Sequence, residues 1–192
     1  MRHEMKHRWA LVVMGMWLMG SVCTAFIASQ NFYAIDRLLA ARPNPAFASA
    51  VDRLGSPRGR ELLRYLSSEL NRLYFQIWNI VQLVLGGLAL WLVTARAPRR
   101  GIGAMVIMVV VTLVYLTPAI VSLGRSLDFV PRDPAPPDVQ RFWILHAAYT
   151  SLEVIKLVVG VVATAGMAVK PSVLADSPGA PEPSANVHQF ER

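Results

Sequence analysis

The chain has 192 residues, of which 54% are hydrophobic and only 16% are charged. A soluble domain usually carries about 25% charged residues, so this deficit favours a protein whose surface meets lipid. The formal net charge is +7, but the basic residues mostly flank apolar runs, which favours lipid headgroups over nucleic acid as partners. The single cysteine, Cys23, excludes an intrachain disulfide.

Four apolar runs are long enough to cross the roughly 30 Å hydrocarbon core of a bilayer as helices. They cover residues 9–28, 73–95, 102–124 and 142–169, and the first three contain no charged residue. Backbone polar groups in lipid must pair within the protein, and the runs lack the alternating polarity of a transmembrane barrel. The sequence therefore predicts an all-α, polytopic membrane protein, a bundle of four transmembrane helices. The first run is longer than a signal-peptide core, so we expect it to be retained.

The first two runs extend into longer helices, because residues 31–42 and 57–72 keep helical apolar spacing. We expect helices over about 5–42, 57–95, 102–124 and 141–169, the first two of which are roughly 55–60 Å long. These two form a hairpin that projects beyond the membrane, with a short interfacial helix in its turn. Pro118 is expected to kink the third helix. Residues 1–170 then make one membrane domain, and residues 171–192, rich in Pro, Ser and Ala, are predicted to be a disordered tail.

The distribution of basic residues favours a multi-pass protein of a cell membrane with both termini in the cytoplasm. Basic residues precede the first run, separate the second from the third, and follow the fourth: Arg2, Lys6, Arg8, Arg96, Arg99, Arg100 and Lys170. The opposite side carries Arg125, Arg132 and Arg141 between the last two runs. The segment 31–72 contains seven arginines on the side where this rule expects few.

Polar residues share one face of the second and fourth helices at matching offsets of zero, four, seven and ten. The second helix carries Arg72, Gln76, Asn79 and Gln82, and the fourth carries His146, Tyr149, Thr150, Glu153 and Lys156. Both helices cross the membrane in the same direction, so equivalent positions reach similar depth. We predict that the two polar faces meet in the bundle interior, either as hydrogen bonds between helices or as a path for a proton, an ion or a polar ligand.

Two further groups suggest cofactors, although no pattern in the sequence requires one. His146 is a candidate axial ligand for haem iron or chlorophyll magnesium, shared with a neighbouring protein because the other histidines are terminal. Met16, Met19 and Cys23 share one face of the first helix, and soft sulfur ligands suit Cu(I). Methionine and cysteine are also common fillers of apolar helices, so packing is the alternative for this group.

The chain also contains residue patterns of a known family. The first helix has Trp17, Gly20 and Phe26, followed by Asn31-Phe32. The second helix is preceded by Leu62-Leu63 and contains Tyr74-Phe75. The fourth helix begins with Arg141-Phe142, followed by Leu145-His146. In these features, between about residues 11 and 166, the chain resembles small four-helix membrane proteins of unknown function. That family is related to the transmembrane protein 205 group and, more distantly, to copper-resistance D membrane proteins. The resemblance implies a four-helix membrane fold and supplies no activity.

The sequence contains no phosphate-binding glycine loop, no paired cysteines, no zinc-protease motif and no nucleophile elbow. The leading hypothesis is therefore a membrane protein without enzymatic activity, an accessory or structural subunit that binds other membrane protein subunits in a larger complex. The first alternative is a small permease or an ion- or metal-handling protein that uses the polar face of the second and fourth helices. Haem or chlorophyll binding through His146 is the second.

Overall fold

The computed structural model describes residues 2–131 and 133–169, and the regular structure within them is entirely helical. The helices are α1 (Arg2–Ala41), α2 (Pro45–Leu54), α3 (Ser56–Leu92), α4 (Arg96–Val111), the π-helical turn η1 (Thr112–Leu116), α5 (Thr117–Ser126) and α6 (Asp138–Ala168). Four of the resulting units are long and apolar enough to cross a membrane: α1, α3, the continuous α4–η1–α5 segment, and α6. The predicted all-helical chain with four long apolar helices is confirmed for these residues. The predicted tail at 171–192 lies outside them.

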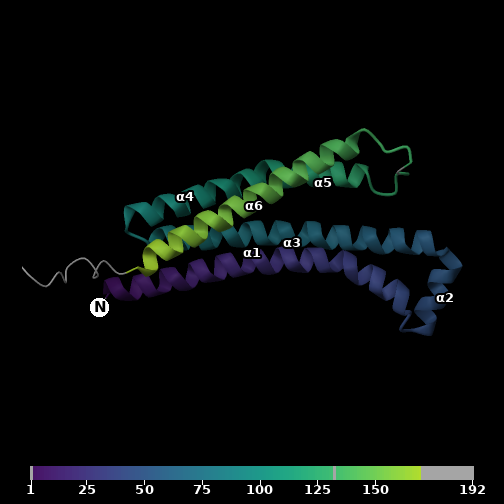
Figure 1. Cartoon of the computed structure of the whole chain (residues 1–192), viewed down its shortest axis with the longest axis horizontal. Coiled ribbons are helices and arrows are strands. Elements are labelled where there is room, and N and C mark those ends of the chain that lie inside the picture. The colour runs from purple at the N-terminus through teal and green to yellow at the C-terminus, as the bar shows by residue number, and fades with distance from the viewer. Residues whose placement is uncertain (1, 132, 170–192) are drawn as a thin grey trace, which may run out of the picture.

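The helices α1 and α3 form a long antiparallel hairpin, and α2 closes its far end (Figure 1). The helix α2 stands where a short helix was expected in the turn. Its N-cap is Asn44, whose side-chain oxygen accepts the amide hydrogens of Ala46 and Phe47 at 2.9 and 3.1 Å. Proline at the first helical position suits this start, because the missing amide hydrogen would have no partner there.

Polar contacts hold the two arms together beyond their apolar runs. Asn31 Nδ2 donates to Asn71 Oδ1 at 2.7 Å, and Asn71 Nδ2 donates to the carbonyl of Ala28 at 2.9 Å. The Asp36 carboxylate pairs with Arg60 at 2.9 Å between the arms. These contacts set the register of α1 against α3.

Several arginines of the segment 31–72 have partners within the hairpin. Arg42 pairs with Asp52 at 2.7 Å, and the guanidinium of Arg64 lies 5.2 Å from the centroid of the Phe32 ring. Through these contacts the arginines stabilise the hairpin, whichever side of a membrane it lies on. They offer a physical reason for the arginine content of this segment on either side of a membrane.

The third apolar segment contains a π-helical turn just before Pro118. The amide of Thr117 donates to the carbonyl of Thr112, five residues earlier, instead of the usual four. Because proline lacks an amide hydrogen and crowds the preceding turn, a widened turn at this point accommodates it. A π-bulge at η1 therefore lies where the kink at Pro118 was expected, and the kink itself stays a prediction.

The four long units are arranged in a ring in which α1 packs against α3 and α6, and α4 packs against the same two helices. The helices α3 and α6 are thus diagonal to each other, and both can turn a face to the centre. An apolar core lies at the end that holds the N-terminus of α1, with Met14, Trp17, Ile102, Met105 and Val109 fully buried. Toward the other end, α5 and the start of α6 stand away from α3 (Figure 1).

Two adjacent glycines of α3 provide a test of this close packing. A Cβ atom on Gly86 would lie 2.6 Å from Val106 and 2.9 Å from the Trp17 ring, whereas one on Gly87 meets nothing within 4 Å. We expect Gly86→Ala to destabilise the protein by about 1–3 kcal/mol through overpacking. The matched control Gly87→Ala should be neutral or slightly stabilising, since alanine favours helix by about 1 kcal/mol. Thermal unfolding in detergent measures both, and equal midpoints would contradict the packing.

Candidate functional site

A fully buried lysine lies at the centre of the molecule. Lys156 in α6 is 1% exposed, and its ammonium donates to Gln82 Oε1 in α3 and, at 2.5 Å, to Glu153 Oε1 in its own helix. The indole nitrogen of Trp17 in α1 donates to the same Gln82 oxygen at 3.0 Å. Three of the long helices therefore meet at one side-chain carbonyl.

Further hydrogen bonds continue from this point to a fourth segment. Gln82 Nε2 donates to Asn79 Oδ1 at 3.3 Å, and Asn79 Nδ2 donates to the Thr117 hydroxyl at 3.0 Å. Both amide side chains are fully buried. Because an unpaired amide or charge in an apolar interior costs several kcal/mol, each member of this chain needs its neighbour. We call the six residues Trp17, Asn79, Gln82, Thr117, Glu153 and Lys156 the central polar network.

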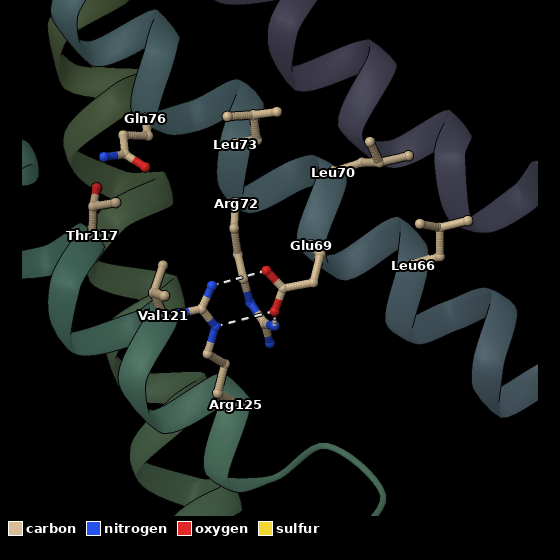
Figure 2. Close-up of a pocket in the computed structure, with 9 residues that line it drawn as sticks. All are labelled: Leu66, Glu69, Leu70, Arg72, Leu73, Gln76, Thr117, Val121 and Arg125. Atoms are coloured by element: carbon tan, nitrogen blue, oxygen red, sulfur yellow. Dashed lines mark hydrogen bonds and ion pairs between the residues drawn. The ribbon is translucent and has the colours of Figure 1, made fainter.

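The network borders a groove between α3 and α5 with a volume of about 420 Å³ (Figure 2). Its lining combines leucines and a valine with charged and polar groups: Leu66, Glu69, Leu70, Arg72, Leu73, Gln76, Thr117, Val121 and Arg125. Figure 2 shows Gln76 and Thr117 at one end of this groove and Arg125 at the other. Thr117 belongs to both the groove and the network, so the groove leads to the buried hydrogen bonds.

Ion pairs between α3 and the end of α5 lie at the outer end of the groove. The Glu69 carboxylate accepts two hydrogen bonds from Arg125, at 2.9 and 3.1 Å, and one from Arg72 (Figure 2). Arg72 also pairs with Asp128 at 2.9 Å, and both of these side chains are largely buried. The cluster fastens α3 to the end of α5 and to the residues that follow it. Its two positive and two negative charges balance.

The structure brings together part of the predicted polar face. Gln82 bonds to Lys156, and the Phe75 ring lies 5.6 Å from the ring of Tyr149, and in both pairs the residue numbers differ by 74. The two helices therefore run in parallel with the depth relation that the matching offsets indicate. Asn79 and Glu153 take part in the same network through Gln82 and Lys156.

For the remaining members, the prediction of an inward-facing polar set is wrong. His146 and Thr150 are exposed, and the Thr150 hydroxyl bonds to the His146 carbonyl of its own turn at 3.0 Å, so it needs no partner on another helix. Gln76 is exposed in the groove, and Arg72 belongs to the ion pairs. The physical reason is the divergence of α6 from α3 toward the start of α6, so the polar residues of the two helices do not meet at this level (Figure 1).

The candidate cofactor ligands lie apart from the network. His146 stacks on Phe142 with ring centroids 5.9 Å apart and meets Trp143 edge-on. Met16, Met19 and Cys23 are exposed on the outer face of α1. Within the part of the chain that the structure describes, no three His, Cys, Asp or Glu side chains are grouped to hold a metal ion. Haem, chlorophyll or copper binding therefore stays a prediction.

Sequence reasoning missed two members of the network. Trp17 was part of a family pattern and Thr117 was an unremarked neighbour of Pro118, yet both supply hydrogen bonds at the centre. A tryptophan in the middle of an apolar run, away from the headgroup region, is a usable signal, because its indole N–H needs an acceptor. Thr117 carries no comparable signal, since its position depends on the π-helical turn.

Comparison of this chain with protein-family models, with curated proteins and with solved structures finds no match. The resemblance to small four-helix membrane proteins stays a prediction. Function must therefore be argued from the site.

The ion pair of the network provides a second test. We expect Glu153→Gln to destabilise the protein by about 3–5 kcal/mol, because it leaves the buried Lys156 charge without its carboxylate. The double variant Glu153→Gln, Lys156→Met removes both charges and should recover most of that loss. Thermal unfolding in detergent gives the comparison. A double variant that is less stable than Glu153→Gln would show that the pair is not the source of the effect.

Proposed function

We propose that this chain is a non-enzymatic, multi-pass protein of a cell membrane, with cytoplasmic termini, that admits a small polar solute or ion to the central polar network. The observation that carries this proposal is the unbroken series of hydrogen bonds from Thr117, at the groove, to the buried Lys156. In this proposal the four long helices form a transmembrane bundle, and the end of the α1–α3 hairpin projects beyond the bilayer.

The two ends of the molecule differ in a way that suits a permease. The groove, with its charged outer end, opens on one side of the network, while Met14, Ile102 and Met105 fill the other side. A site near the bilayer middle that is reached from one side and sealed on the other is what alternating access requires. In this proposal the π-helical turn η1, which adjoins Thr117 in the groove, is the hinge, since π-bulges within α-helices are frequent at functional sites.

A purely structural role explains this network less well. Hydrogen bonds between membrane helices contribute only about 0.6 kcal/mol each, so apolar packing would serve as well. An ionisable pair in the membrane costs several kcal/mol to bury, which makes a functional use the default interpretation. The lysine and glutamate therefore favour a permease over simple helix adhesion.

Permeability of proteoliposomes tests this function. Stopped-flow light scattering would compare sodium chloride, urea and glycerol with protein-free liposomes, and we expect at least one to cross faster. Thr117→Val keeps the shape but removes the hydroxyl, so it should lower that rate several-fold by cutting the link to Asn79. The matched control Thr164→Val loses a hydroxyl that bonds within its own helix and should leave the rate unchanged. Equal permeability with and without protein for all three probes would overturn the proposal.

A second candidate, an accessory subunit of a larger complex, has support at the hairpin. Leu62 and Leu66 are exposed on α3 outside its apolar run, and near them Tyr65 and Phe129 lie with ring centroids 5.1 Å apart. Exposed apolar side chains that cluster in this way are typical of surfaces that bind other proteins.

Extraction in a mild detergent distinguishes an accessory subunit from a permease that acts alone. If the hairpin binds a partner, the chain should migrate in native gels as part of a larger assembly. The variant Leu62→Asn, Leu66→Asn should release it, while Leu88→Asn on the apolar run should not, because that exposed side chain lies within the predicted span. A chain that runs as a monomer in several detergents would exclude the accessory role.

A further inference from the structure

The ion-pair cluster at the outer end of the groove has a buried half and an exposed half. The side chains of Arg72 and Asp128 are 14% and 18% exposed, and they pair with each other. The Glu69 side chain is 28% exposed and that of Arg125 is 60% exposed, and both line the groove (Figure 2). The four charges cancel, so a ligand in the groove meets a neutral cluster through its Glu69–Arg125 half.

The Glu69–Arg125 pair keeps both a donor and an acceptor for a ligand. Arg125 bonds to the carboxylate through Nε and Nη2, and within the described residues its Nη1 makes no hydrogen bond. Glu69 Oε1 accepts from both arginines, whereas Oε2 accepts from Arg125 alone. A carboxylate has about four acceptor positions, so Oε2 can accept one more hydrogen bond. A donor for an oxyanion therefore lies beside an acceptor for an ammonium.

The rest of the groove suits the apolar and ester parts of a lipid. Leu66 and Leu73 line it and are 55% and 49% exposed, and the exposed amide of Gln76 lies at its inner end. Its volume of about 420 Å³ falls within the roughly 300–1,000 Å³ of small-ligand pockets and is too small for two long acyl chains. A headgroup can therefore occupy the groove while the chains run outside it along the leucines.

We infer that the groove binds the headgroup of a zwitterionic phospholipid with a primary ammonium, such as phosphatidylethanolamine. The phosphate accepts from Arg125 Nη1, the ammonium donates to Glu69 Oε2, and the amide of Gln76 donates to an ester carbonyl. This inference goes beyond the proposed permease, because it needs only that the chain lies in a bilayer.

Charge and hydrogen bonding select this headgroup over others. An anionic lipid would add one uncompensated negative charge to a neutral cluster, whereas a zwitterion adds none. A choline headgroup has the same net charge but no N–H group, so it cannot donate to Glu69. The primary ammonium provides both the charge and the hydrogen bond, and hydrogen bonds between charged groups are the stronger kind.

The position of the pair along its helices favours a lipid over a soluble zwitterion. Arg125 is the residue before the end of α5 at Ser126, where the third candidate span also ends. In the proposed bilayer arrangement this level is the boundary between hydrocarbon and water, where headgroups lie. Phospholipid is concentrated at that boundary, and the exposed leucines beside the pair are positioned to contact its chains.

Native mass spectrometry of the full-length protein in detergent tests the site without any variant. The protein would be titrated with phosphatidylethanolamine, phosphatidylcholine and phosphatidylglycerol that carry identical acyl chains. We expect phosphatidylethanolamine to be retained several-fold more than either of the others. Equal retention of the three would overturn the inference. Binding of free glycerophosphoethanolamine as tightly as the intact lipid would also overturn it, since the occupant would then be a soluble zwitterion.

Two variants then locate the site. Glu69→Gln removes the acceptor and leaves Arg125 with a surplus charge, so phosphatidylglycerol should now be retained more than phosphatidylethanolamine. Arg125→Gln removes the phosphate donor and should weaken retention of phosphatidylethanolamine several-fold. The matched control Arg100→Gln removes an exposed arginine near the opposite end of the same apolar unit and should change nothing. An equal loss in this control would contradict the site. Lipid retention is measured apart from permeability, so this inference and the proposed permease can fail separately.

Discussion

The buried charge of Lys156 is the constraint on which the rest of the structure depends. An ammonium buried away from water needs acceptors from the protein itself, and Gln82 and Glu153 supply them. Meeting this need sets α6 beside α3 in parallel register, although the two helices are diagonal in the ring. It also places Trp17 and Gly86 in direct contact, since the indole reaches Gln82 only where α3 has no side chain in its way.

Polarity changes along the molecule from one end to the other. Apolar side chains from α1, α3, α4 and α6 fill the end near the N-terminus, the central polar network follows, and the groove with its ion pairs occupies the other end. A bundle held only by apolar packing has no reason for such a gradient. In the permease that we propose, this gradient sets the direction of access, and the π-helical turn η1 lies beside Thr117 at the groove.

The matching offsets in α3 and α6 indicated the partners at the centre but not at the ends. Gln82 and Lys156 meet as the spacing implies, because both lie where the four units converge. His146 and Thr150 continue the same periodic face and remain exposed, because α6 has diverged from α3 at that level. Periodicity describes one helix at a time, so it cannot report where a neighbouring helix departs. The ion pairs Glu69–Arg125 and Arg72–Asp128 each join residues 56 positions apart and leave no local pattern.

The sequence by itself determined the all-helical class, the four long apolar units, the short helix in the hairpin turn and an irregularity of the third unit near Pro118. These depend on local properties: apolar length, helical spacing and the missing amide hydrogen of proline. The tertiary structure alone decided which polar residues are buried, that Trp17 and Thr117 join them, and that a groove leads to them. These features arise where helices far apart in the chain cross or diverge. The distance between their backbones, rather than the order of residues, decides which side chains can touch.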